Sequence, residues 1–375
     1  MKIKEQTLLL SLLLSGIPQL LPAQYSLKSE LNVPRAGDVI IKQQVEYKDP
    51  GRSGENVLWD FGELKSVNDK YTLSYSEPDA IGDSVYIMGK DTVLLKNLDG
   101  GRLLIGTEHH TMYYYYLTHN RLWALGHENP TTLLQYTQPL IAGMYPMQYQ
   151  DSCRYAYQSK GLYSSTVPFT SDGEAQIRAD ACGMMILPSG DTLRNVLLTR
   201  TLQSIRQVFP TGDSTTVEHN SSMETCKWYS KGCRYPVFET IRTLIKTDTA
   251  EIVNFETAFF FPPEEHSYLE DDPENTALLE ENPDSISDPW AELTYNFYPN
   301  PVKTNLEIEV YMPRQGEVKM QLTDRLGRIV WKKDFGKWNE GAHSAQIFMS
   351  PFVNGEYVLN MWFDEYMTGE KILKR

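Results

Sequence analysis

The sequence lacks the features that most often identify an enzyme, a metalloprotein or a membrane-spanning helix. It has no Gly-rich phosphate loop, no Gly-x-Ser-x-Gly elbow and no His-Glu-x-x-His pair. Its 4 cysteines include no Cys-x-x-Cys, so their spacing fits no zinc pattern. No segment beyond the N-terminus is apolar enough to cross a membrane as a helix. We therefore expect no cofactor, no metal and no transmembrane segment, and the sequence offers no catalytic residues.

Positive charge is also scarce. The 375 residues include 35 Lys and Arg against 49 Asp and Glu, which gives a formal net charge of −14. A strongly acidic chain is a poor partner for nucleic acid or for an anionic membrane surface. The length is sufficient for two or three domains with a substantial core.

The first 23 residues have the layout of a secretory signal peptide. Lys2 and Lys4 precede an apolar stretch from Leu8 to Leu14, and the small residue Ala23 follows Pro22. This three-part pattern predicts export and cleavage after Ala23. The apolar stretch is shorter than the roughly 20 residues that span a bilayer.

Cysteine is absent from the first 150 residues, which excludes lipid attachment at a signal-peptide cysteine. An even number of cysteines in an exported chain favours disulfides, and three connectivities are open. We predict the pairs Cys153–Cys182 and Cys226–Cys233, because each pair straddles a plausible hairpin turn, at 168–173 and 229–232.

An acidic segment divides the chain. Residues 263–292 contain many Asp and Glu and several prolines, but no Lys, Arg or Gly. Charge repulsion and proline disfavour a packed core, and a calcium loop would need a glycine turn. We predict a signal peptide at 1–23, a β-rich cargo domain at 24–262, an acidic flexible linker at 263–292 and a small domain at 293–375.

The chain predicts an all-β fold. Strand candidates lie at 57–61, 71–75 and 85–88, with longer ones at 175–187, 196–209 and 252–261. Turn residues separate them, and no segment has sustained helical periodicity. We expect an antiparallel sandwich or half-barrel for the cargo domain. Alternation of Leu306, Ile308 and Val310 with glutamates predicts a small C-terminal immunoglobulin-like β-sandwich.

The C-terminal residues contain four short motifs in a fixed order. They are Tyr298-Pro299-Asn300-Pro301, then Asp324-x-x-Gly327, then Gly355-x-Tyr357, and finally the basic end Lys371-Ile372-Leu373-Lys374-Arg375. This order resembles the type A C-terminal sorting domain of the type IX secretion system. The resemblance implies passage through the periplasm, recognition by the type IX machinery and a secreted or outer-membrane surface location. In that family some cargoes are retained by lipopolysaccharide attachment.

The cargo has a fainter resemblance of its own. Segments 56–61, 183–191 and 228–237 are similar to a β domain found ahead of such sorting modules. That domain brings no established activity. The layout is also similar to periplasmic half-barrels that hold apolar ligands, which is an analogy of fold alone.

Two clusters are the main candidates for a binding or metal site. His109, His110, His119 and His127 lie close together in the sequence but without metal-ligand spacing, so they favour structural or surface roles. The run from Tyr113 to Tyr116 could stack on sugars, although alternate tyrosines on a strand also pack cores. We expect a non-catalytic binding role. The alternatives are an apolar-ligand-binding half-barrel and a secreted hydrolase whose site is not visible in the sequence.

A modification pattern recurs through the chain. Asp followed by Ser or Thr and a small or aliphatic residue resembles the O-glycosylation site of bacteria that use this secretion route, and it equally initiates turns before strands. The candidate acceptors are Ser84, Thr92, Thr192, Ser214, Thr249 and Ser285.

Overall fold

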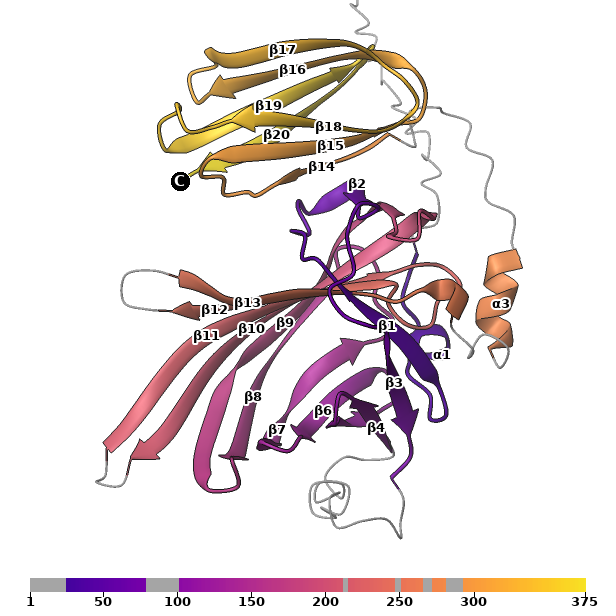
Figure 1. The fold of residues 1–375 in the computed structure, drawn as a ribbon, viewed down its shortest axis with the longest axis vertical. Helices are drawn as coiled ribbons and strands as arrows, with labels where there is room; N and C mark the ends of the chain where they lie inside the picture. Colours follow the sequence, from indigo (N-terminus) through magenta and orange to yellow (C-terminus); the bar gives the residue numbers. More distant parts are fainter. Residues whose placement is uncertain (1–24, 79–100, 212–214, 247–250, 266–271, 281–292) are drawn as a thin grey trace, which may run out of the picture.

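The computed structural model describes residues 25–78, 101–211, 215–246, 251–265, 272–280 and 293–375 (Figure 1). The predicted signal peptide and the strand candidate at 85–88 lie outside these residues. Across the described ranges, no helix has the length and apolar character needed to span a membrane.

The described cargo domain is built almost entirely of strands, as predicted. They are β1 (Val39–Val45), β2 (Gly54–Asp60), β3 (Tyr71–Ser76), β4 (Arg102–Glu108), β5 (Thr111–Leu117), β6 (Arg121–Glu128), β7 (Thr132–Met144), β8 (Ser152–Tyr163), β9 (Val167–Ile186), β10 (Thr192–Thr211), β11 (Thr215–Tyr229), β12 (Phe238–Lys246) and β13 (Glu251–Phe260).

The cargo strands other than β2 close into a ring. Consecutive strands pair in antiparallel fashion around the order β9-β10-β11-β12-β13-β1-β3-β4-β5-β6-β7-β8, and β8 then returns to β9. The closing pair joins the first and last cargo strands, with Gln43 of β1 opposite Phe260 of β13. The sheet is therefore more complete than a half-barrel, and its inner face encloses a space.

Strand β2 lies outside the ring and runs parallel to β9. Gly183 on β9 permits this approach, because a Cβ at that position would collide with the backbone of Val57. An aromatic core lies where β2 packs on the ring of strands. In this core, Trp228 packs edge-on against Trp59 and Phe61, with ring centroids 6.0 and 5.4 Å away. Burial of these large aromatic side chains holds β2 against the closed ring of strands.

The C-terminal domain is a two-sheet antiparallel sandwich, which confirms the predicted fold. Its core is a cluster of buried residues that includes Phe297, Leu306, Leu359 and Phe363. One sheet has the order β14-β15-β18 and the other β17-β16-β19-β20. The strands are β14 (Thr294–Tyr298), β15 (Asn305–Met312), β16 (Gly316–Asp324), β17 (Ile329–Trp338), β18 (Gly341–Phe348), β19 (Gly355–Phe363) and β20 (Tyr366–Lys374).

Helical structure is short. It consists of α1 (Ser29–Asn32), the 3₁₀ turn η1 (Pro263–Glu265) and α3 (Pro273–Glu280). Helix α3 and η1 fall within the range predicted as a flexible linker, and Asp272, which precedes α3, is fully buried. Its carboxylate pairs with Arg234 of the cargo domain at 2.7 Å. This part of the acidic segment is packed rather than extended; the domain boundaries themselves stay a prediction.

The two domains meet at residues 48–53, which we call the docking loop. The backbone N–H of Arg52 donates to Asn296 Oδ1 at 2.9 Å, and Arg52 Nε donates to the carbonyl of Tyr295 at 3.0 Å. Lys48 Nζ pairs with Glu309 at 2.6 Å. A single parallel bridge, Tyr295 with Val57, then joins β14 to β2, so the sheet of the C-terminal domain continues from the cargo sheet (Figure 1).

Candidate functional site

The ring encloses a cavity of ≈ 670 Å³. Every strand of the ring contributes side chains to it, from Lys42 on β1 and Tyr71 on β3 to Glu239 on β12 and Thr257 on β13. Alternation explains this lining, because every second residue of a strand points to the same face. The volume lies within the range of about 300–1,000 Å³ that is usual for small-molecule sites.

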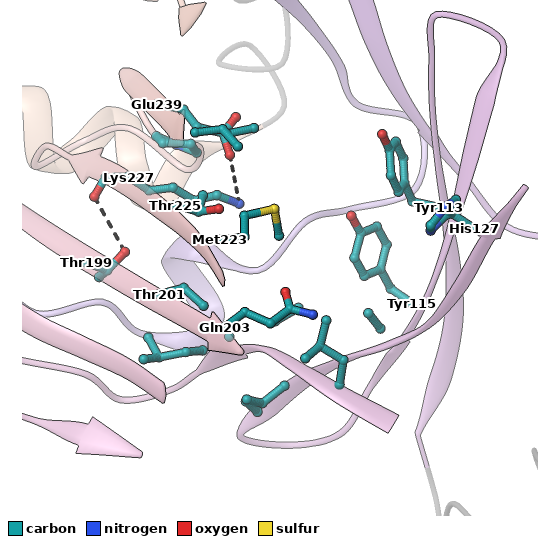
Figure 2. A pocket seen from close by; sticks show the side chains of 18 of the residues that line it. Tyr113, Tyr115, His127, Thr199, Thr201, Gln203, Met223, Thr225, Lys227 and Glu239 are labelled. Carbon is teal, nitrogen blue, oxygen red and sulfur yellow. Dashed lines mark hydrogen bonds and ion pairs between the residues drawn. The ribbon is translucent and has the colours of Figure 1, made fainter. Parts of the chain in front are cut away.

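The cavity has two chemically different walls (Figure 2). Tyr113 and Tyr115 of β5 project from one side, whereas Gln203 of β10 and Met223 of β11 project from the other. The second wall carries a row of hydroxyl and amide groups. Its members are Thr199, Thr201, Gln203, Thr225 and Thr257.

Four charged side chains form a cluster in the lining, which we call the charge cluster. Lys42 Nζ donates to Glu108 Oε2 at 2.8 Å and lies 3.7 Å from Glu239 Oε2. Glu239 Oε1 lies 3.5 Å from Lys227 Nζ. Two cations and two anions alternate, so the cluster compensates its own charge. Lys42 is only 4% exposed and its ammonium lies 4.4 Å from the Phe259 ring centroid, a cation–π contact.

Burial sets the protonation of the aromatic wall. It raises the pKa of Tyr71, Tyr113 and Tyr115, and the charge of Glu108 raises them further. These phenols therefore stay neutral and can donate hydrogen bonds. Burial lowers the pKa of His127, which keeps its imidazole neutral near pH 7.

The two predicted side-chain clusters have divided roles. Tyr113 and Tyr115 line the cavity, whereas Tyr114 and Tyr116 are buried in a separate core cluster, as alternation requires. Of the histidines, His109 and His127 line the cavity, while His110 and His119 are exposed. No group of three or more potential metal-binding side chains occurs in the part of the chain that the structure describes.

The residues predicted as the sorting motif come from the two ends of the small domain and meet in space. Asn300 Nδ2 donates to the Lys371 carbonyl at 2.9 Å, and the Leu373 N–H donates to Asn300 Oδ1 at 2.8 Å. Tyr298 donates its hydroxyl to Glu309 Oε1 at 2.8 Å. The prolines 299 and 301 direct the chain between these contacts, each with a cis peptide bond before it. The motif thus fastens the last strand to the first.

The remaining motif residues shape turns and the basic end. Asp324 accepts hydrogen bonds from the N–H groups of Leu326 and Arg328, and Gly327 has a φ of 76°, so the predicted hairpin turn is present. Gly355 opens β19, and Tyr357 is buried two residues later. At the basic end, Lys371 is exposed and pairs with Glu356 at 2.6 Å, whereas Lys374 is buried.

The predicted disulfides are not supported, since Cys153, Cys182, Cys226 and Cys233 are all free. The turn placed at 168–173 is instead part of β9, whose register sets Cys153 opposite Ile177. Cys182 lies five residues further along an extended strand, roughly 16 Å away, well beyond the reach of a disulfide. Cys226 and Cys233 are buried thiols in one core cluster, and burial raises the pKa of both.

One glycosylation candidate can be placed. Thr192 is exposed at the start of β10. The other five acceptors, Ser84, Thr92, Ser214, Thr249 and Ser285, lie outside the described residues.

Comparison with known proteins assigns the small domain. Residues 296–375 match the family described as the secretion system C-terminal sorting domain. The protein is therefore a type IX secretion cargo that carries its sorting domain at the C-terminal end, and it is secreted or exposed at the cell surface. No curated protein and no solved structure matched the chain.

Sequence reasoning missed the charge cluster. A charged residue in a strand usually marks the solvent face, so neither Lys42 nor Glu239 stands out in the sequence as a cavity residue. The alternation of residues along the strand was the available signal, because Lys42 lies on the same face of β1 as the fully buried Ile40. A cation on an apolar face is a candidate for a buried polar site.

Proposed function

We propose that this exported protein binds a small amphipathic molecule inside the closed sheet of its cargo domain. The observation that carries the proposal is the cavity of ≈ 670 Å³, which combines an aromatic wall with a wall of hydroxyl and amide groups. Apolar walls with a few placed polar groups are typical of ligand sites. This interpretation deepens the general binding role and replaces the purely apolar ligand with one that has a polar side.

The hydrolase alternative requires two carboxylates that flank a scissile bond. Glu108 and Glu239 do converge in the cavity, but the Lys42 ammonium sits between them, 2.8 Å from one and 3.7 Å from the other. It occupies the place that the substrate bond would need. The cluster thus favours binding over hydrolysis.

The exported chain should bind the neutral fluorophore N-phenyl-1-naphthylamine, and Thr201→Phe should weaken this binding by about tenfold or more, because the new ring fills the cavity. Leu202→Phe is the matched control. Leu202 is the next residue of β10, but it is 40% exposed and lies outside the cavity lining. Fluorescence titration measures both variants, and circular dichroism checks that they fold.

A chain that does not bind the fluorophore, or two variants that bind it equally well, would refute the cavity as a binding site. Release of reducing sugar during incubation with oligosaccharides would favour the hydrolase instead.

A further inference from the structure

The most informative residue in the cavity is Glu239. It is only 8% exposed, yet its two carboxylate oxygens lie 3.5 and 3.7 Å from the nearest ammonium groups, those of Lys227 and Lys42. Both distances exceed the normal range for an N–H···O hydrogen bond. Among the described residues, no side chain donates a hydrogen bond to this carboxylate. A buried carboxylate in this state needs a donor from a ligand or from water.

The neighbouring ammonium of Lys42 also has unused capacity. An ammonium carries three donors. Lys42 uses one in its hydrogen bond to Glu108 and presents its charge to the Phe259 ring. A carboxylate in need of donors therefore lies beside an ammonium with donors to spare. A hydroxyl group satisfies both, because it can donate to the carboxylate while it accepts from the ammonium.

The net charge of the site limits the ligand further. Lys42 and Lys227 balance Glu108 and Glu239. A ligand with its own net charge would therefore bring an uncompensated ion beside Lys42 and Glu239, the two most buried members of the cluster. A purely apolar ligand would leave Glu239 without donors. A neutral ligand with several hydroxyl groups meets both conditions.

The rest of the cavity fits the same chemistry. Tyr113 and Tyr115 place aromatic rings on one wall, where the apolar C–H face of a sugar ring can pack, and Gln203 and Thr225 on the opposite wall offer partners to its hydroxyl edge (Figure 2). Stacking on an aromatic ring and hydrogen bonding to a hydroxyl-bearing wall act on different sides of such a molecule.

We infer that the cavity takes a neutral saccharide of one or two rings, whose hydroxyl groups bridge Glu239 and the lysines of the charge cluster. This inference rests on the proposed function and names its ligand class. The cavity is large enough for a ligand of this size.

The test is calorimetric titration of the exported chain with a panel of neutral mono- and disaccharides, together with the charged analogues glucuronate and glucosamine. At least one neutral saccharide should bind and displace N-phenyl-1-naphthylamine. Its charged counterpart should bind about tenfold more weakly or worse. Glu239→Gln should weaken saccharide binding about tenfold or more, since a hydrogen bond to a charged group is lost, while fluorophore binding should change less than about twofold.

The matched control is Glu256→Gln. Glu256 is exposed on the neighbouring strand β13 and is absent from the cavity lining. Retained fluorophore binding shows that each variant is folded. If the fluorophore enters the cavity but no neutral saccharide binds, or if Glu239→Gln leaves saccharide affinity unchanged, the ligand class is wrong and the binding function stands. If the fluorophore itself does not bind, the proposed function fails first.

Discussion

At the scale of single residues, the clearest contrast is between two kinds of buried charge. In the cavity, Glu239 is held at distances too long for hydrogen bonds. In the packed part of the acidic segment, Asp272 receives two short hydrogen bonds from Arg234 of the cargo domain, at 2.7 and 2.8 Å, and another from Asn275 at 2.9 Å. The Glu239 carboxylate can therefore still accept hydrogen bonds from a ligand, whereas the Asp272 carboxylate already has its hydrogen-bond partners. We assign the Asp272–Arg234 pair a purely structural role.

Asp272→Asn should destabilise the protein by about 3–5 kcal/mol, because it leaves the Arg234 guanidinium buried without its counter-ion. The free energy of unfolding, measured by urea denaturation, tests this. Asp172→Asn is the control, because Asp172 is 41% exposed and pairs with Arg206 at the surface, where a salt bridge contributes little to stability. Equal losses in the two variants would contradict the structural role.

The loss of folding stability at acid pH tests the same Asp272–Arg234 pair. Burial alone would raise the pKa of Asp272, but the hydrogen bonds from Arg234 and Asn275 outweigh it and hold the pKa below its ordinary value. The carboxyl therefore binds its proton less readily in the folded than in the unfolded chain. Its stabilisation is complete above the unfolded pKa of about 3.9 and is lost as the pH falls through the folded pKa. In Asp272→Asn, this part of the acid destabilisation should be missing.

At the scale of elements, the docking loop is shaped from both sides. On the cargo side, Trp59 donates its indole N–H to the Pro50 carbonyl at 2.9 Å, and Arg242 pairs with Asp49 at 3.7 Å. On the other side, Asn296 of β14 fills the space above Gly51, where any Cβ would overlap the Asn296 side chain. The sorting domain therefore rests on a site that the cargo domain has already shaped.

Gly51→Ala should loosen the contact between the domains, because the added methyl collides with Asn296 and Gly51 has a φ of 75°. Asn296→Ala should act in the same direction, because it removes the two hydrogen bonds that the Asn296 side chain makes to the docking loop. Hydrogen exchange in residues 294–298 and the radius of gyration should both rise. Gly190→Ala is the matched control: its φ is also positive, at 92°, but no atom lies within 4 Å of the added carbon. An unchanged exchange rate in all three variants would mean that the loop does not hold the domains together.

Local signals in the sequence predicted where the strands lie, but not which strands pair with one another. The strands around 57–61, 71–75 and 196–209 follow from alternation and turn residues, and the hairpin at Asp324 follows from its Gly327. Ring closure between β1 and β13 depends on pairing between distant segments, which no local pattern specifies. The wrong Cys153–Cys182 pairing has the same origin, because a Pro–Gly turn signal at 168–173 is overridden by the long ladder between β8 and β9.

At the scale of the whole molecule, we expect the sorting domain to determine location and the cargo domain to fold without it. Deletion of residues 293–375 removes no strand of the ring, since closure is made by β13 and β1. The truncated protein should therefore bind N-phenyl-1-naphthylamine like the full chain but accumulate in the periplasm. Cell fractionation and fluorescence titration measure the two properties separately. Surface delivery of the truncated protein would contradict the sorting role of the domain.

The pairing of the first cargo strand with the last has a consequence for how the protein matures. As the chain emerges residue by residue, β1 has no partner on one edge until β13 has been delivered, almost a whole domain later. An unpaired edge invites association with other chains, and distant pairings form slowly. Until that last strand arrives, the interior has no fixed walls. A ligand can therefore be enclosed only after the chain has been delivered through β13 and has closed onto β1.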